Sequence, residues 1–203
     1  MAPRIVDKEA KKNQIIQAAL QVFAKNGIAK SKMIDIANAA GVGKGTIYEY
    51  FRSKEEIFAE AYNTFFADMK ESLITHIAEV DDPVEKLNLL SNLSFSFLDS
   101  ESRDFAAVMM DFWAEGVRTK NDEMLEIVNL KRTYTEYRTL ISQIVREGIQ
   151  KGIFKKVDVD SYSAILIAAL DGILLQTIID PNIINLVNVE KTLSETLISG
   201  LKK

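Results

Sequence analysis

The residues with the clearest chemistry lie close together near the N-terminus, in a segment that covers residues 44–50. Lys44 supplies a positive charge, and Tyr48 and Tyr50 supply hydroxyl donors on flat rings. Side chains of these types suit hydrogen bonding to phosphate oxygens and to the edges of nucleic-acid bases. We therefore expect this segment, together with Thr46, to present a nucleic-acid-binding surface.

Two short helical patterns would position these side chains. Residues 33–40 and 44–50 are separated only by Gly41-Val42-Gly43, which is too short for anything but a helical corner. Ala37 suits the close crossing of the two helices, and Gly41 suits a turn residue of positive φ. The pattern is typical of a helix-turn-helix, whose second helix enters the major groove of DNA. The alternative is an ordinary packing corner with half-buried tyrosines. The buried positions are expected to be Ile36, Ala40, Val42 and Ile47.

The charge distribution favours the same end of the chain as the partner of a polyanion. Residues 1–55 carry ten basic and five acidic side chains, a net charge of +5, whereas the whole chain of 203 residues has a net charge of -4. The remainder therefore carries -9. A basic segment on an acidic body indicates that only the N-terminal quarter meets nucleic acid; a merely solvated basic end is the alternative.

Composition excludes several other classes. The sequence has no cysteine and one histidine, His76, so neither a disulfide nor a metal site is expected, and we expect no cofactor. Gly41, Gly43 and Gly45 are too closely spaced for a dinucleotide fingerprint. No nucleophile, base and orienting group stand in a recognisable order, which disfavours a helical enzyme acting on a small hydrophobic substrate. The N-terminus lacks the apolar region of a secretory signal, and the longest apolar run, residues 164–170, cannot span a bilayer. A cytoplasmic protein with no membrane partner is expected.

Helical periodicity along the chain predicts an all-α fold of about nine helices. We expect a three-helix domain over residues 1–53 and a helical bundle over residues 54–203. Ser53 and Glu56 form a capping box that opens the fourth helix, and Asp82 with Pro83 starts the fifth. The remaining helices are expected at about residues 9–25, 122–151, 161–179 and 189–201, with one more around residues 109–113.

Aromatic and apolar side chains in the bundle predict two further surfaces. Residues 161–179 are apolar on nearly all faces, so this helix needs burial on two sides, against the core and against a second subunit. A membrane span is disfavoured by Asp171 near its middle, and Gly172 beside it permits close helix approach. The expected interface residues are Ile165, Asp171, Gly172, Leu175, Leu193 and Leu197. The candidates for an apolar ligand pocket, each of which is also a candidate for plain core, are Phe97, Phe105, Met109, Phe112, Trp113, Tyr134, Tyr137 and Tyr162.

The run AGVGKGTIYEYFRSKEEIF strongly resembles the signature of the TetR family of transcriptional regulators, and the resemblance covers about residues 8–60. It implies a three-helix DNA-binding domain, a ligand-binding and dimerisation body, and repression relieved by a small molecule. Many relatives have serine where this chain has Gly43, which weakens the capping of the recognition helix. Ser31 is expected to cap the second helix and to face the DNA backbone. The DNA-binding residues that the resemblance implies are Ser31, Lys32, Gly43, Lys44, Gly45, Thr46, Tyr48, Tyr50 and Lys54, the last as a phosphate contact.

These observations predict a homodimeric repressor that binds a palindromic operator in double-stranded DNA and is released by a small, largely hydrophobic effector. The alternative is a DNA-binding dimer without an effector, or an activator.

Overall fold

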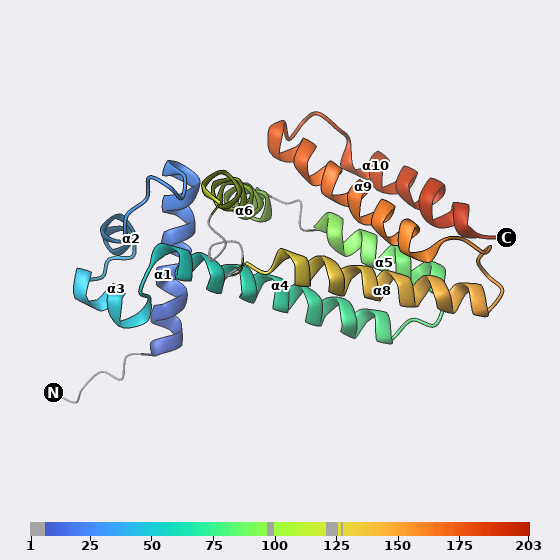
Figure 1. The fold of residues 1–203 in the computed structure, drawn as a ribbon, viewed down its shortest axis with the longest axis horizontal. Coiled ribbons are helices and arrows are strands. Elements are labelled where there is room, and N and C mark those ends of the chain that lie inside the picture. The colour runs from blue at the N-terminus through green and yellow to red at the C-terminus, as the bar shows by residue number, and fades with distance from the viewer. Residues whose placement is uncertain (1–6, 97–99, 121–125, 127) are drawn as a thin grey trace. The chain divides into compact units, whose positions relative to one another are not determined.

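The computed structural model describes residues 7–96, 100–120, 126 and 128–203, and its helices are drawn in Figure 1. The all-α prediction is confirmed: outside the helices, the described residues hold an isolated bridge between Phe154 and Lys202. The α-helices are α1 (Lys8–Asn26), α2 (Met33–Ala39), α3 (Lys44–Tyr50), α4 (Lys54–Ala78), α5 (Pro83–Ser96), α6 (Ser100–Thr119), α8 (Leu130–Gln150), α9 (Val159–Ile179) and α10 (Leu186–Leu193). After α10 the chain continues as a π-helical turn, Ser194–Ile198, and a 3₁₀ turn, Ser199–Leu201.

The predicted continuous helix over residues 122–151 is interrupted. Residues 128–129 form a turn, and α8 begins only at Leu130, whereas the preceding helix α6 ends at Thr119. Residues 122–125 and 127, on which the prediction also fell, lie outside the described residues. The turn has a packing reason, because Val128 is buried in one compact unit and Leu130 opens a helix of another. Continuous helical periodicity in the sequence does not reveal this change of packing partner.

Local capping signals set most other helix ends. Asp7 caps α1 by accepting hydrogen bonds from the amides of Glu9 and Ala10. The first contact of the predicted capping box of α4 is confirmed, since the amide of Glu56 donates to the Ser53 hydroxyl at 3.1 Å. The Glu56 carboxylate reaches back one residue further than a capping box requires and accepts from the amide of Arg52 at 2.6 Å.

The first compact unit combines residues 1–67 with residues 104–129. Its core is aromatic: the Phe58 ring stacks on Phe112 at 4.3 Å and on Phe105 at 6.1 Å, and meets Phe23 edge-on at 6.5 Å. Phe58 and Phe112 are almost fully buried. Most of α6 therefore belongs to the same compact unit as the three N-terminal helices and packs there on Phe58 of α4, whereas the sequence placed the domain boundary at residue 53.

The second compact unit combines residues 68–103 with residues 130–203. Helices α5, α8, α9 and α10 run side by side in it (Figure 1). Leu87, Ile141, Phe154, Leu166 and Ile198 are all fully buried in its continuous apolar core. The bundle thus has a continuous apolar core of its own, to which α5, α8 and α9 all contribute side chains.

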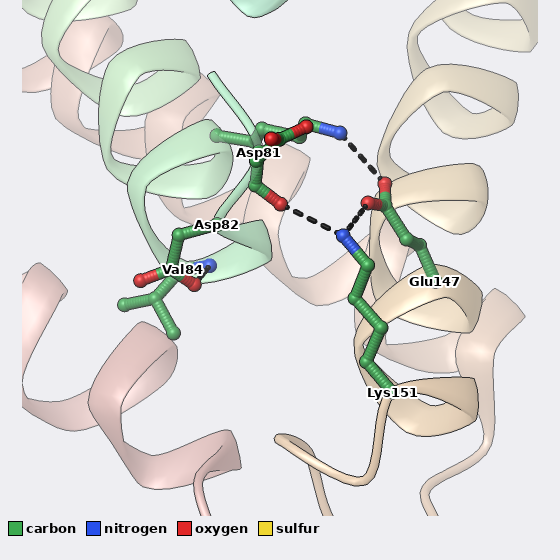
Figure 2. A network of polar contacts seen from close by, with 6 residues as sticks. Asp81, Asp82, Val84, Glu147 and Lys151 are labelled. Carbon is green, nitrogen blue, oxygen red and sulfur yellow. Dashed lines mark hydrogen bonds and ion pairs between the residues drawn. The ribbon is translucent and has the colours of Figure 1, made fainter.

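Glu147 on α8 joins two lysines at the edge of the second unit, as Figure 2 shows. Its carboxylate accepts from Lys86 on α5 at 2.8 Å and from Lys151 at 2.7 Å. Lys151 also donates to the backbone carbonyl of Asp81 at 2.9 Å. The hydrogen bonds from the two lysines lower the pKa of Glu147, and the bond from Lys151 has the larger effect. The network fixes the end of α8 to the loop before α5.

Candidate nucleic-acid interface

The corner between α2 and α3 has the geometry predicted from its residues. Gly41 adopts φ +63°, a left-handed conformation that favours glycine. Ile36, Ala37 and Ile47 are fully buried, and α2 packs both on α1 and on α3. Ala40 is also buried, and Val42 is half-buried.

Helix α3 turns its polar side chains away from this core. Lys44 is exposed, Tyr48 is 48% exposed, and Thr46 and Tyr50 are half-buried. Ile47 is fully buried between them and anchors the helix. Lys44 and Tyr48 are four residues apart, so their exposed side chains lie on one face of the helix, where a grooved partner can reach both.

The glycines that open α3 are not explained by packing inside the protein. A Cβ atom at Gly45 would meet nothing within 4 Å, and one at Gly43 would meet only the Thr46 hydroxyl at 3.7 Å. Neither residue has positive φ. A glycine that neither its own backbone conformation nor packing within the protein requires is typical of a position where a ligand approaches the backbone closely. As predicted, Gly43 is the N-cap and provides no side-chain hydrogen bond.

Ser31 does not have the place predicted for it. Its side chain is 3% exposed, and its hydroxyl donates to the carbonyl of Gly27 at 2.7 Å. The N-cap of α2 is instead Lys32, whose amide donates to the Asp35 carboxylate at 3.1 Å. The hydroxyl is used inside the loop after α1, which satisfies a carbonyl there. Lys32 is exposed, as a contact residue must be.

Lys54 also makes contacts that the sequence did not predict. Its ammonium donates to the carbonyls of Ile28, Ala29 and Ser31, at 2.6, 3.1 and 3.1 Å. An ammonium has three N–H donors, and these three bonds use all of them. In this structure Lys54 therefore holds the loop between α1 and α2, and a phosphate contact would have to replace one of these bonds.

The predicted pocket residues are divided between the two units. Phe105, Met109, Phe112 and Trp113 belong to the first unit, where both phenylalanines are core residues and Trp113 is 46% exposed. The three tyrosines belong to the second unit: Tyr134 donates to Asp171 at 2.9 Å, Tyr137 to the Met69 sulfur at 3.2 Å and Tyr162 to the Leu197 carbonyl at 3.1 Å. Burial raises the pKa of Tyr162. Phe97 lies outside the described residues.

Helix α9 carries an apolar face that the second unit leaves uncovered. Ile165 is 56% and Leu175 is 41% exposed, and a Cβ at Gly172 would meet nothing within 4 Å. Leu193 is 5% exposed and Leu197 packs against the same core, so these two predicted interface residues face inward. Sequence reasoning missed Ile179, which is 71% exposed. Its signal was the spacing of residues 165, 168, 172, 175 and 179, which alternates steps of three and four and keeps one helix face.

Within the part of the chain that the structure describes, no group of three or more histidine, aspartate or glutamate side chains is arranged to hold a metal ion. Helix α9 is the one described helix that is long and apolar enough to cross a membrane, but core helices of soluble proteins meet the same criterion.

An exposed polar helix on a buried helix-turn-helix corner, followed by a helical bundle, defines a helical DNA-binding regulator. Comparison with known proteins identifies the family of regulators. Residues 15–61 match the family described as bacterial regulatory proteins, tetR family, and residues 83–201 match the family described as BetI-type transcriptional repressor, C-terminal. The chain belongs to the TetR family of bacterial transcriptional regulators.

Individual relatives agree with this placement. The fatty acid metabolism regulator protein of Bacillus subtilis is 29% identical over 195 residues, which are 96% of this chain and 97% of that protein. A crystal structure of the regulator FadR from Bacillus subtilis, in complex with stearoyl-CoA, has 30% identity and a TM-score of 0.77, with 93% of this chain and 98% of that chain covered. A regulator from Saccharomonospora viridis in complex with choline shares the fold, with a TM-score of 0.82, 23% identity and coverage of 97% and 100%. These relatives are named as regulators.

Proposed function

We propose that the protein is a homodimeric repressor of the cytoplasm that binds a palindromic operator through α3 and leaves it on binding a small, largely hydrophobic effector. The observation that carries the proposal is the polar face of α3 on a fully buried anchor, Ile47. On this proposal Lys44 contacts phosphate, and Tyr48 with Thr46 and Tyr50 contacts phosphates or base edges. Gly43 and Gly45 let the backbone approach the DNA.

The uncovered face of α9 supports the homodimer. Ile165, Leu175 and Ile179 are exposed apolar side chains on one side of the helix, and a contiguous exposed apolar face is typical of an interaction surface. A second copy presents the same face, so a two-fold axis pairs the two helices. Asp171 lies beside this face and is hydrogen-bonded by Tyr134 within its own subunit. Two-fold symmetry in the protein corresponds to two half-sites in the operator.

The effector would act by changing the separation of the two α3 helices. Half-sites recur at one helical turn of DNA, so a shift of a few ångströms misplaces both readers. The effector can do so only through different affinities for the two states of the protein. Stearoyl-CoA is the first compound to test, because the regulator bound to it is 30% identical over nearly the whole chain.

The experiment begins with selection of the purified protein against random duplex DNA. We expect an inverted repeat as the winner, bound far more tightly than random DNA. Lys44→Ala is expected to weaken binding and to lower the slope of log K against log salt by about one, as the loss of one phosphate contact requires. Tyr48→Ala is expected to weaken binding without that change of slope. Lys70→Ala is the matched control, because Lys70 is an exposed lysine of the second unit paired with Glu136.

Three results would contradict parts of the proposal separately. Unchanged affinity in both α3 variants would remove α3 as the reader. A monomer at micromolar concentration, or a Leu175→Glu variant that sediments as a dimer like the unsubstituted protein, would remove the α9 interface. Operator binding that stearoyl-CoA leaves unchanged would exclude that compound as effector and favour a regulator that responds to another ligand or to none.

A further inference from the structure

The loop between α1 and α2, residues 27–32, is held by side chains from two distant helices. From α6, the Asp111 carboxylate accepts a hydrogen bond from the backbone amide of Ile28 at 2.7 Å. From α4, Lys54 donates to three carbonyls of the same loop. The amide side and the carbonyl side of the loop are thus fixed by opposite charges, and Ile28 itself is 1% exposed.

The contact from α6 lies beside the end of α1. Gly27 ends α1 with φ +73°, which favours glycine, and a Cβ there would be in ordinary van der Waals contact with an Asp111 oxygen at 3.4 Å. The neighbouring Phe112 stacks on Phe58 at 4.3 Å, so the backbone of α6 has little freedom to slide without unpacking a core ring. The Asp111 carboxylate is therefore held at a defined place against the loop.

The loop in turn sets the start of the DNA reader. It leads directly into α2 at Lys32, and α2 packs against α3 through fully buried Ile36, Ala37 and Ile47. A shift of the loop consequently moves α2, and α3 with it, because a close-packed corner moves as one piece.

We infer that Asp111 is a positioning residue of the DNA reader, through which the position of α6 determines operator affinity. The residue lies 83 positions beyond Ile28 in the chain and acts on the reader through the loop that it holds. The inference rests on the proposed function of α3 as the operator-binding helix. It assigns Asp111, on a helix in the middle of the sequence, an indirect role in how tightly DNA is bound.

The test uses the full-length protein and its selected operator. Asp111→Ala removes the acceptor, Asp111→Asn keeps an oxygen acceptor without the charge, and Glu115→Ala removes a carboxylate one turn later that pairs with Arg118 on the same helix. We expect Asp111→Ala to weaken operator binding by roughly ten-fold, the scale of a lost charge-assisted hydrogen bond. Asp111→Asn should stay within about three-fold and Glu115→Ala within about two-fold of the unsubstituted protein.

The direction of this effect separates positioning from simple electrostatics. Removing a negative charge from a DNA-binding protein on its own strengthens its attraction to DNA, so weaker binding by Asp111→Ala has the opposite sign. The slope of log K against log salt should stay unchanged, because Asp111 touches no phosphate. Hydrogen exchange at the Ile28 amide should become faster in Asp111→Ala and remain slow in Glu115→Ala.

The inference is overturned if Asp111→Ala exposes the Ile28 amide to exchange yet binds the operator as tightly as the unsubstituted protein. It is equally overturned if Asp111→Ala and Glu115→Ala lose the same affinity. A protein that selects no sequence even without substitution would instead refute the proposed function itself, and the two failures are thus distinguishable.

Discussion

Gly148→Ala is expected to destabilise the protein strongly, although alanine is the better helix-forming residue. Gly148 lies inside α8, and a Cβ atom there would fall 2.1 Å and 2.4 Å from two atoms of the Phe154 ring. A third ring atom would lie at 2.8 Å. Phe154 is fully buried in the core of the second unit, so the ring has no free space to enter.

The size of the effect follows from two opposing contributions. Alanine in a helix interior gains about 1 kcal/mol over glycine. Forcing an extra carbon into a packed core costs about 1 to 3 kcal/mol, and driving a phenylalanine out of its site approaches the roughly 3 to 5 kcal/mol of a Phe→Ala substitution. With all three contacts well below van der Waals distance, we expect a net loss of about 2 to 4 kcal/mol in the free energy of unfolding.

The same substitution should change sign when the ring is absent. In a Phe154→Ala background the clash disappears, and the alanine at position 148 keeps only its helical advantage. Gly148→Ala should then stabilise by about 0.5 to 1 kcal/mol. A control is Gly45→Ala, since a Cβ at that helical position meets nothing within 4 Å and should stabilise in any background.

The measurement is equilibrium unfolding in urea at one protein concentration, followed by far-ultraviolet circular dichroism, for the four proteins of the double-mutant cycle. Equal effects of Gly148→Ala in both backgrounds would refute the reasoning, because they would show that the ring does not restrict position 148. A stabilising Gly148→Ala in the otherwise unsubstituted protein would refute it as well.

Two further predictions concern ionisable groups of the second unit. The lowered pKa of Glu147 means that its carboxylate stabilises the fold above the pKa of the unfolded chain, and that this contribution is lost as pH falls through the folded pKa. Glu147→Gln should therefore lower the free energy of unfolding by about 1 kcal/mol at pH 7, because it weakens the contacts with two lysines. The difference from the unsubstituted protein should shrink in acid. An equal difference at pH 7 and pH 3 in urea unfolding would contradict this. Desolvation raises the pKa of Asp171, while the hydrogen bond from Tyr134 opposes the shift, so the ionised carboxylate costs stability above the unfolded pKa and protonation restores it. Asp171→Asn keeps an acceptor for Tyr134 and should melt at a higher temperature than the unsubstituted protein at pH 7, with a smaller gain at pH 5; a lower melting temperature at pH 7 would show that the charge itself is needed.

Much of the fold was predictable because its signals are local. The capping contact of Ser53 and the turn at Gly41 depend on neighbours within four residues, and both are present as expected. Asp82 likewise caps α5, with its carboxylate accepting from the amide of Val84 at 2.9 Å. Such features need only the chemistry of a side chain and the backbone beside it.

The parts that could not be predicted depend on which distant segments meet. Nothing near Asp111 in the sequence shows that its carboxylate binds the amide of Ile28, and nothing near Lys54 shows that its ammonium reaches the same loop. Phe112 and Tyr134 have similar apolar patterns around them but belong to different units. Periodicity identifies which helix face is buried and leaves open what covers it.

The DNA-reading part of the chain is assembled from two separate stretches of the polypeptide, and this affects the order of events during synthesis. The first unit needs residues 104–129 as well as residues 1–67, and residue 129 is made 62 residues after residue 67. At about 5 to 20 residues per second, that interval lasts roughly 3 to 12 s. Until residues 105 and 112 are made within that interval, Phe58 lacks the two rings that stack on it, Phe105 and Phe112. A nascent regulator thus cannot have a complete DNA reader while it is less than about two-thirds translated, and a fragment that stops before α6 would expose the aromatic core.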